Sequence, residues 1–329
     1  MNRVFVLGAG FSKAINTVMP VLGELQTRVQ DKLNARGIEI SDDLEAIGDL
    51  ERWLSLLAEP APWLSPPEQL SDTALFLHVS QAIHDVVNDD QERAATGLAP
   101  DWLQALVRHW HDTGAPVITF NYDCLVELAY LDMMPESGTY WPWDLYAIPI
   151  TPAWVRAGGG ARQRPQSFRL LKLHGSLGWW YSGPEAPESD PIYWMGWDGH
   201  FGQGTRQLWA EFGGDGLVSD KIPMIVPPAA TKAPFYKNRL LASQWAQAAE
   251  ALHDAEELVL MGYSAPATDL TVTTLIATNF KGRAIVPVNI DRSIIDSAGR
   301  LGNRSSPPEV VENFIDTDAI EKWTAGRTT

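Results

Sequence analysis

Five short segments of the chain carry side chains suited to binding a phosphorylated ligand or moving a proton. Each follows an apolar run and combines small residues with an amide, a carboxylate, a hydroxyl or an imidazole. They are Gly8-Ala9-Gly10-Phe11-Ser12, Asn121-Tyr122-Asp123, His174-Gly175-Ser176, Gly262-Tyr263-Ser264 and Asn289-Ile290-Asp291. Glycines let a backbone approach a phosphate, amides and hydroxyls suit a ribose, and histidine titrates near neutral pH.

The segment from Gly8 to Ser12 is typical of a turn that holds a diphosphate. It follows the apolar run Val4–Leu7 and leads into a predicted helix, whose first N–H groups carry partial positive charge. The fingerprint is incomplete, because Lys13 stands where the third glycine of a dinucleotide-binding turn would be. A tight strand-to-helix turn without a ligand is the alternative interpretation.

Two segments supply candidate catalytic groups. Asn121 offers a donor and an acceptor, suited to a ribose hydroxyl or a water, whereas Asp123 offers acceptors only. Both residues also suit the cap of a helix that begins near Cys124. His174 ends an apolar run beside a glycine, where it can face a ligand and act as a general base. A structural histidine is the alternative.

The remaining two segments suit the ribose and phosphate groups of a nucleotide. Gly262, Tyr263 and Ser264 follow one apolar run, and Asn289 and Asp291 follow the next. Hydroxyl, amide and carboxylate groups at such places can bind the hydroxyls of an adenosine ribose. Ordinary turn chemistry explains each segment when it is taken alone.

The apolar runs that precede these segments lack alternation, which indicates strands covered on both faces. A helical stripe over Lys237–Ala255 leads directly into one of them, as in an αβ unit. We therefore predict an α/β fold, a Rossmann-like parallel sheet sandwiched by helices, with the five segments at one edge. The predicted strands are Arg3–Leu7, Pro116–Phe120, Phe168–Leu173, Lys221–Val226, Glu257–Met261 and Ala284–Asn289.

The pattern predicts a single domain over residues 1–329 with two insertions. Residues 24–112 predict a helical insertion between the first and second strands. Residues 135–216 are rich in Gly, Pro and Trp, and predict an irregular insertion around the 168–173 strand. The pair Trp179-Trp180 could stack on a ligand ring, but packing into a satellite core is the interpretation that we favour.

Composition argues against several classes of binding partner and against one class of metal site. The chain has 25 Lys+Arg against 41 Asp+Glu, a net charge of −16, which argues against direct binding of nucleic acid or an anionic membrane. The single cysteine, Cys124, excludes a disulfide framework and a cysteine-based zinc site. No run approaches the roughly 18 apolar residues of a membrane span, and the first residues lack the pattern of an export signal. We expect a cytoplasmic protein.

Taken in order, GAGFS, TFNYD, KLHGS, GYS and VNID are similar to the motifs of the sirtuin-like (silent information regulator two-like) NAD-consuming domain. The resemblance extends over residues 1–297, without the detail of the two insertions. It implies NAD as substrate. It also implies that Asn121 positions the ribose or the attacking water, that Asp123 shapes that pocket, and that His174 is the general base.

The resemblance assigns the rest of the ligand to the other motifs. The diphosphate would lie against Gly8, Ala9, Gly10, Phe11 and Ser12. The adenosine half would lie against the residues after the last two predicted strands, which are Gly262, Tyr263, Ser264, Asn289 and Asp291.

Two departures from the family bear on the reaction. The chain has one cysteine, so the four-cysteine zinc module of the protein-deacylating members is impossible. The Asp-Phe-Arg stretch of those members is also missing, since residues 19–24 contain neither Asp nor Arg. The pattern is similar to the zinc-free bacterial branch, whose members hydrolyse NAD in anti-phage defence. The resemblance thus implies an NAD+ hydrolase that releases nicotinamide and ADP-ribose in abortive infection.

Two alternatives stay open, a zinc-free NAD-dependent protein deacylase or ADP-ribosyltransferase, and a non-catalytic sensor of NAD or ADP-ribose. Because a cell cannot tolerate constant destruction of NAD, the resemblance also implies that the activity is gated. We expect gating by a homo-oligomer or by a separately encoded defence partner, such as a nucleic-acid-handling ATPase.

Overall fold

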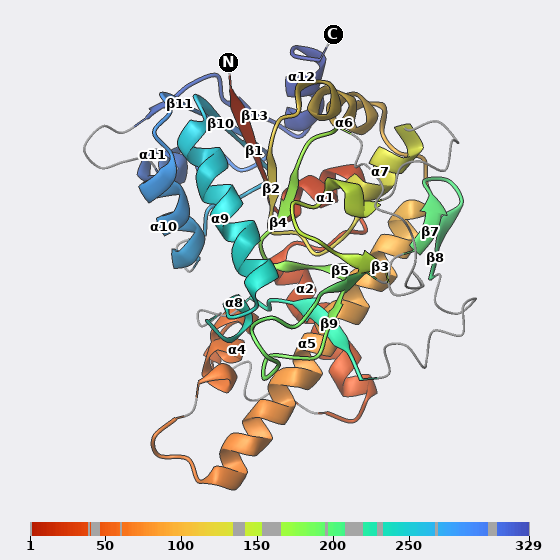
Figure 1. Cartoon of the computed structure of the whole chain (residues 1–329), viewed down its shortest axis with the longest axis vertical. Coiled ribbons are helices and arrows are strands. Elements are labelled where there is room, and N and C mark those ends of the chain that lie inside the picture. Colours follow the sequence, from red (N-terminus) through yellow and green to blue (C-terminus); the bar gives the residue numbers. More distant parts are fainter. Residues whose placement is uncertain are drawn as a thin grey trace.

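The computed structural model describes residues 2–38, 40, 47–59, 61–133, 142–152, 166–194, 197–207, 220–228, 233–266, 269–301 and 308–328. Within these ranges the chain forms a large parallel sheet with helices on both faces. A smaller sheet and several helices lie beyond the carboxyl ends of its strands (Figure 1). In the same ranges no helix combines the length and the apolar character needed to cross a bilayer.

The main sheet contains seven strands, and all its paired strands are parallel. The order is β12-β11-β10-β1-β2-β4, and β13 also pairs with β11. Numbered along the chain, this is the strand order of the Rossmann fold, so the predicted fold class is confirmed. The strands are β1 (Arg3–Leu7), β2 (Val117–Thr119), β4 (Leu170–Lys172), β10 (Glu257–Met261), β11 (Ala284–Asn289), β12 (Glu309–Val310) and β13 (Phe314–Ile315).

Each face of this sheet is covered because its strands bury side chains in both directions. Along β1, Val4 and Val6 belong to one hydrophobic cluster, while Phe5 and Leu7 belong to the other. The first cluster is closed by α9 (Arg239–Asp254), α10 (Leu270–Asn279) and α11 (Ile294–Leu301). The second is closed by helices on the opposite face (Figure 1), which are α1 (Ala9–Ile15), α6 (Asp101–Thr113), α7 (Leu125–Met133) and α12 (Ala319–Ala325).

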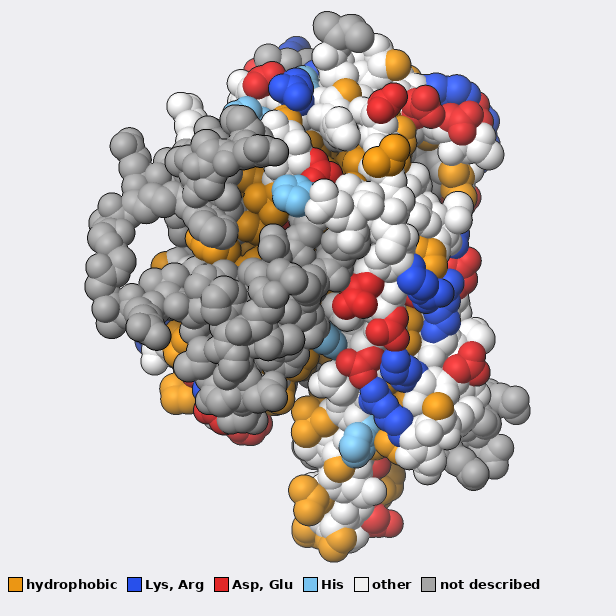
Figure 2. Space-filling model, turned by 90° about the vertical axis from the view of Figure 1, so that its right-hand side faces the viewer, with side chains coloured by type: hydrophobic (Ala, Val, Ile, Leu, Met, Phe, Trp, Pro, Cys, Tyr) orange, Lys and Arg blue, Asp and Glu red, His pale blue; other side chains and the backbone are white. Residues whose placement is uncertain are grey.

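Helices fill the stretch where the sequence predicts a helical insertion. Besides α6 they are α2 (Leu22–Ala35), α4 (Leu50–Ala58) and the long α5 (Pro66–Ala95). Ion pairs join α2 to α5, between Arg28 and Asp90, between Lys32 and Asp89 at 2.7 Å, and between Arg36 and Asp85. Figure 2 shows one face of the molecule, on which Lys and Arg side chains lie close to Asp and Glu side chains. Hydrophobic side chains gather at the lower tip of the molecule in the same view.

One predicted strand lies in a different sheet. The run Lys221–Val226 was expected as a parallel strand of the main sheet, but β9 (Ile222–Ile225) pairs antiparallel with β5 (Gly175–Tyr181). That prediction is wrong, because a buried apolar run has the same appearance in either kind of sheet. The second sheet has the order β3-β6-β5-β9, where β3 is Thr151–Pro152 and β6 is Tyr193–Trp194.

The described part of the Trp-rich segment is more regular than expected. It contains β5, β6, a two-stranded sheet of β7 (Trp197–His200) and β8 (Gly204–Gln207), and a short 3-10 helix over Pro142–Leu145. Trp179 and Trp194 are fully buried. The Trp179 ring meets Tyr146 edge-on at 5.1 Å, and Trp143 lies 4.8 Å from Trp194. These tryptophans therefore have a packing role, as expected, but they belong to the hydrophobic cluster that also contains Phe5 and Leu7 of β1 and do not form a separate satellite core.

Gly175 joins the two sheets, and its backbone conformation leaves no alternative to glycine. Its φ is +84°, and a Cβ there would lie 2.0 Å from the carbonyl oxygen of Met224 in β9.

Gly37 provides a matched comparison, because its φ is +76° but a Cβ at that position would have no atom within 4 Å. Gly37→Ala should therefore lower the free energy of unfolding by about 1–2 kcal/mol, the cost of the left-handed backbone alone. Gly175→Ala should cost about 1–3 kcal/mol more, because of the overlap.

Urea denaturation of the two variants beside the wild type measures both costs. Equal losses of stability in Gly175→Ala and Gly37→Ala would contradict the predicted contact between β9 and the start of β5.

Candidate functional site

The candidate site lies where the strand order of the main sheet reverses. β1 has β10 on one side and β2 on the other, with Leu7 opposite Met261 and Thr119. In open parallel sheets this point leaves a crevice beyond the carboxyl ends of the strands. The residues that follow β1, β2, β4, β10 and β11 are the five segments singled out in the sequence.

The glycines of the first segment serve close packing between two loops. Gly10 donates its N–H to the carbonyl oxygen of Gly262 at 3.0 Å, and Gly8 donates to that of Met261 at 3.1 Å. A Cβ on Gly8 would lie 2.6 Å from the Cα of Tyr263, and one on Gly10 would lie 2.8 Å from the Gly262 oxygen. A tight turn between β1 and α1 is present, while its binding of a diphosphate stays a prediction, and some of its amides already have partners within the protein.

Asn121, Ser12 and Asp123 form a hydrogen-bonded chain across this edge of the sheet. The Asn121 amide donates to the carbonyl oxygen of Gly8 at 2.9 Å and to Ser12 Oγ at 2.8 Å. Ser12 donates in turn to Asp123 Oδ2 at 2.6 Å. Both donors of the Asn121 amide are thus engaged, so the group that it can offer a ligand is its carbonyl oxygen.

Asp123 faces inward and also caps a helix, the alternative considered from sequence. Its Oδ1 accepts the backbone N–H of Leu125 at 3.2 Å, at the start of α7. Burial raises the pKa of this carboxyl, and the nearby charge of Lys172 and the Ser12 hydrogen bond oppose that shift. Its contacts make it a group that holds Ser12 and the start of α7 in place.

His174 follows β4 and is buried at 7% exposure. The register pairs Thr119 with Lys172, so His174 and Asn121 each lie two residues beyond paired positions on neighbouring strands. The His174 ring lies 5.1 Å from Phe120, whose ring lies 5.0 Å from Tyr263. Through Phe120, the imidazole is therefore connected to the loop after β10.

An acidic residue that sequence reasoning missed lies beside this histidine. Asp269 Oδ2 is 4.0 Å from His174 Nε2, and Asp269 is 8% exposed. It occupies the N-cap position of α10, yet its side chain makes no capping hydrogen bond. From sequence, an Asp just before a helix indicates a cap and nothing more, so no signal distinguished it.

In the segments expected to bind the adenosine half of the ligand, Asn289 and Asp291 make their hydrogen bonds within the protein. The Asn289 amide donates to the carbonyl oxygen of Tyr263 at 3.1 Å, and its Oδ1 accepts the N–H groups of Ile290 and Asp291. Asp291 and Ser264 are exposed. Asp291 accepts hydrogen bonds from the backbone N–H and the hydroxyl of Ser293, which lower its pKa.

Phe11 and Ala9 contribute to the turn in different ways. The Phe11 side chain is 1% exposed and packs into the core, 5.6 Å from Trp102 and 6.2 Å from Trp110. Ala9 is half-buried at the first position of α1. Any contact of Phe11 with a ligand would therefore involve its backbone.

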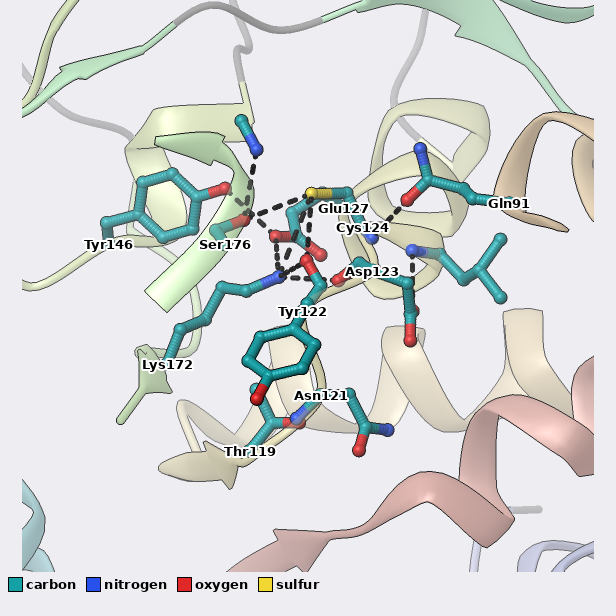
Figure 3. A network of polar contacts seen from close by, with 12 residues as sticks. Gln91, Thr119, Asn121, Tyr122, Asp123, Cys124, Glu127, Tyr146, Lys172 and Ser176 are labelled. Atoms are coloured by element: carbon teal, nitrogen blue, oxygen red, sulfur yellow. Dashed lines mark hydrogen bonds and ion pairs between the residues drawn. The ribbon is translucent and has the colours of Figure 1, made fainter. Parts of the chain in front are cut away.

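A buried lysine organises the segment that carries Asn121 and Asp123. Lys172, at the end of β4, is 1% exposed, and its Nζ donates to the carbonyl oxygens of Asp123 at 2.5 Å and Tyr122 at 3.4 Å. It also pairs with Glu127 Oε1 at 2.9 Å. Figure 3 shows these groups converging on the ammonium. Burial works against the charge of Lys172, but the surrounding acidic groups outweigh burial and raise its pKa.

The remaining members of this network tie α7 to the second sheet. Tyr146 donates its hydroxyl to Glu127 Oε1 at 2.9 Å, and Cys124 Sγ lies 3.2 Å from Ser176 Oγ (Figure 3). Burial, reinforced by the charge of Glu127, raises the pKa of Cys124 well above its usual value, so the thiol is neutral. Among the residues described, no group of three or more His, Cys, Asp or Glu is arranged to hold a metal ion.

Comparison with solved structures finds Sir2 proteins. One, in complex with the inhibitor EX-527, 2′-O-acetyl-ADP-ribose and a deacetylated p53 peptide, is 14% identical with a TM-score of 0.43, over 99% of this chain and 91% of that chain. Another, with a p53 peptide and NAD+, is 13% identical with a TM-score of 0.42, over the same shares.

A third, described for the mechanism and regulation of Sir2 enzymes, is 11% identical with a TM-score of 0.42, over 98% of this chain and 90% of that chain. No family model and no curated protein matches the chain. At this level of similarity, function has to be argued from the residues of the chain itself.

Lys172 should be a principal determinant of the stability of this region. Lys172→Met leaves the buried Glu127 without its positively charged partner, which should lower the free energy of unfolding by about 3–5 kcal/mol. Adding Glu127→Gln removes the unpaired charge, so the double variant should be more stable than Lys172→Met alone. Urea denaturation of the wild type, both single variants and the double variant measures this coupling. Strictly additive losses would contradict the pairing.

Proposed function

We propose that the chain is an NAD+ hydrolase, which cleaves the bond between nicotinamide and ribose and releases nicotinamide and ADP-ribose. The observation that carries this proposal is the buried His174, which follows β4 at the carboxyl edge of the main sheet, with Asp269 Oδ2 4.0 Å from its Nε2. An imidazole beside a carboxylate is a suitable general base, because the carboxylate favours the protonated ring.

In the proposed reaction, the bond from the ribose C1′ to the pyridinium nitrogen breaks and its electron pair passes to the ring. Nicotinamide leaves as a neutral molecule, and positive charge develops on the ribose. A water oxygen then bonds to C1′ while His174 accepts the proton of the water. The products are nicotinamide, ADP-ribose and one proton, so atoms and charge balance.

The proposed role of Asn121 follows from its contacts. Because its two N–H donors bind Gly8 and Ser12, its carbonyl oxygen can accept a hydrogen bond from the water or from a ribose hydroxyl. Asp123, which holds Ser12, is a positioning residue in this scheme. The Gly8–Ser12 turn and the loop after β10 would flank the rest of the dinucleotide.

The biological part of the proposal rests on the sequence resemblance. We infer an NAD-depleting effector of bacterial anti-phage defence, without zinc, whose activity is held off until a trigger arrives. Gating would come from a homo-oligomer or from a separately encoded defence partner. The single cysteine supports the zinc-free assignment, because Cys124 is fully buried among polar partners of its own.

His174→Ala should abolish loss of NAD+, because general-base help contributes about 10²–10⁴-fold to such reactions. Asn121→Ala should abolish it as well, because it removes the carbonyl oxygen that accepts a hydrogen bond from the water or the ribose, together with the hydrogen bonds to Gly8 and Ser12. His253→Ala is the matched control, since His253 is exposed on α9. NAD+ and ADP-ribose are measured in cells that express the wild type or each variant, so that a native trigger or partner is available. Circular dichroism of the purified variants establishes that they fold.

Three outcomes separate this proposal from its rivals. A folded His174→Ala protein that consumes NAD+ at the wild-type rate would contradict the site assignment. Nicotinamide release that depends strictly on an added acyl-lysine peptide would favour a deacylase. Saturable binding of NAD or ADP-ribose with no turnover, in cells or with purified protein, would favour a sensor.

A further inference from the structure

The hydrogen-bond ladder between β2 and β4 ends just before the two residues to which the chemistry is assigned. In its last rung the N–H of Leu173 donates to the carbonyl oxygen of Thr119 at 3.0 Å. The register pairs Thr119 with Lys172, so the next rung of a parallel ladder would run from the N–H of Asn121 to the carbonyl oxygen of Leu173. Within the described residues that rung is not formed, because both of its groups bond elsewhere.

Each backbone group of the missing rung is bonded to a side chain. The N–H of Asn121 donates to Thr119 Oγ1 at 3.1 Å. The carbonyl oxygen of Leu173, a fully buried residue, accepts the indole N–H of Trp245 on α9 at 3.1 Å. Because a backbone group shielded from water needs a hydrogen-bond partner, these two side chains allow the ladder to stop at this point.

Beyond this point the two chains pair with the second sheet. The carbonyl oxygen of His174 accepts the N–H of Val226, just after β9, at 2.9 Å. The carbonyl oxygen of Tyr122 accepts the N–H of Leu177, in β5, also at 2.9 Å. Asn121 and His174 therefore lie where the strands that carry them separate.

Trp245 is held in a fixed position relative to the end of β4. Its ring lies 6.3 Å from the His174 ring and 4.9 Å from the tyrosine ring at the end of α8 (Ala233–Tyr236). The preceding residue, Gln244, is buried, and its Oε1 accepts the backbone N–H of Lys172 at 3.1 Å. Two successive side chains of α9 thus bind backbone groups at the end of β4.

We propose that Trp245 and Thr119 are positioning residues, which hold the ends of β2 and β4 apart and so set the separation between Asn121 and His174. Formation of the missing rung would draw the two backbones to the spacing of paired strands, about 4.8 Å. A sugar or a water between the two chains would be excluded by that pairing. The part of these residues in catalysis rests on the proposed function, whereas the separation of the strands does not.

Hydrogen exchange and stability test the separation without requiring turnover. Thr119→Val removes the acceptor of the Asn121 N–H, and Trp245→Phe removes the donor to Leu173. In the double variant both backbone groups are released, so they can bond to each other and extend the ladder. Exchange of the Asn121 amide, measured by NMR, should be at least tenfold slower in the double variant than in Thr119→Val. The loss of stability in urea should be smaller than the sum of the two single losses.

Turnover of NAD+ gives a second readout. Each single variant should lower kcat about 10- to 100-fold and change KM less than threefold, because a small displacement of reacting groups costs rate more than binding. Thr119→Ser keeps the hydroxyl, so its kcat should stay within threefold of the wild type.

Trp323→Phe is the matched control for Trp245→Phe. Trp323 is a buried residue of α12, on the opposite face of the main sheet, and its indole N–H has no hydrogen-bond partner in the part of the chain that the structure describes. The substitution removes the same atoms without breaking a hydrogen bond, so kcat should stay within threefold. Circular dichroism establishes that every variant is folded.

Exchange at Asn121 that is no slower in the double variant than in Thr119→Val would overturn the inference, as would strictly additive losses of stability. Folded single variants that hydrolyse NAD+ with the kcat of the wild type would overturn it as well. If the wild type never consumes NAD+, while exchange and stability change as expected, the proposed hydrolase fails and the control of strand separation stands.

Discussion

A buried positive charge holds the candidate site together. The ammonium of Lys172 is 1% exposed and needs acceptors at that depth, because an unpaired charge inside a protein is very costly. Glu127 supplies one, and backbone carbonyls of the 121–124 segment supply the others. That segment must therefore follow a path on which Asn121 reaches the turn after β1 and Asp123 reaches Ser12. The positions of the polar groups at this edge of the sheet therefore depend on a charge in the core.

The glycines of the first turn allow close packing between the turn after β1 and the loop after β10. Gly8 and Gly10 approach the loop after β10 so closely that any side chain would overlap its backbone. The contact engages the Gly10 N–H with the carbonyl oxygen of Gly262, which removes one donor from those a diphosphate would use. Recognition of a dinucleotide would then depend more on side chains, above all His174 and the carbonyl oxygen of Asn121. The turn mainly sets the distance between β1 and β10, and so the width of the edge at which these side chains lie.

The helices between β1 and β2 pack against other parts of the fold. α5 packs on the second sheet and on α8, through His84 against Trp180 at 5.9 Å and Phe76 against Phe235 at 6.3 Å. These contacts tie the helical segment to the parts of the fold that lie beyond the carboxyl ends of the main sheet.

The sequence by itself determined the sheet and the rough position of its polar edge. Continuous apolar runs identified β1, β10 and β11 with the same limits that the structure has, because strands buried on both faces need such runs. Only the tertiary structure assigned Lys221–Val226 to a second sheet, because pairing depends on a partner strand far away in the chain. Only the tertiary structure placed Asp269 beside His174. It also paired Lys172 with Glu127, which lies 45 residues earlier in the chain. Local patterns report how a residue is buried, whereas the partner that gives it a chemical role is chosen by the folding of distant segments.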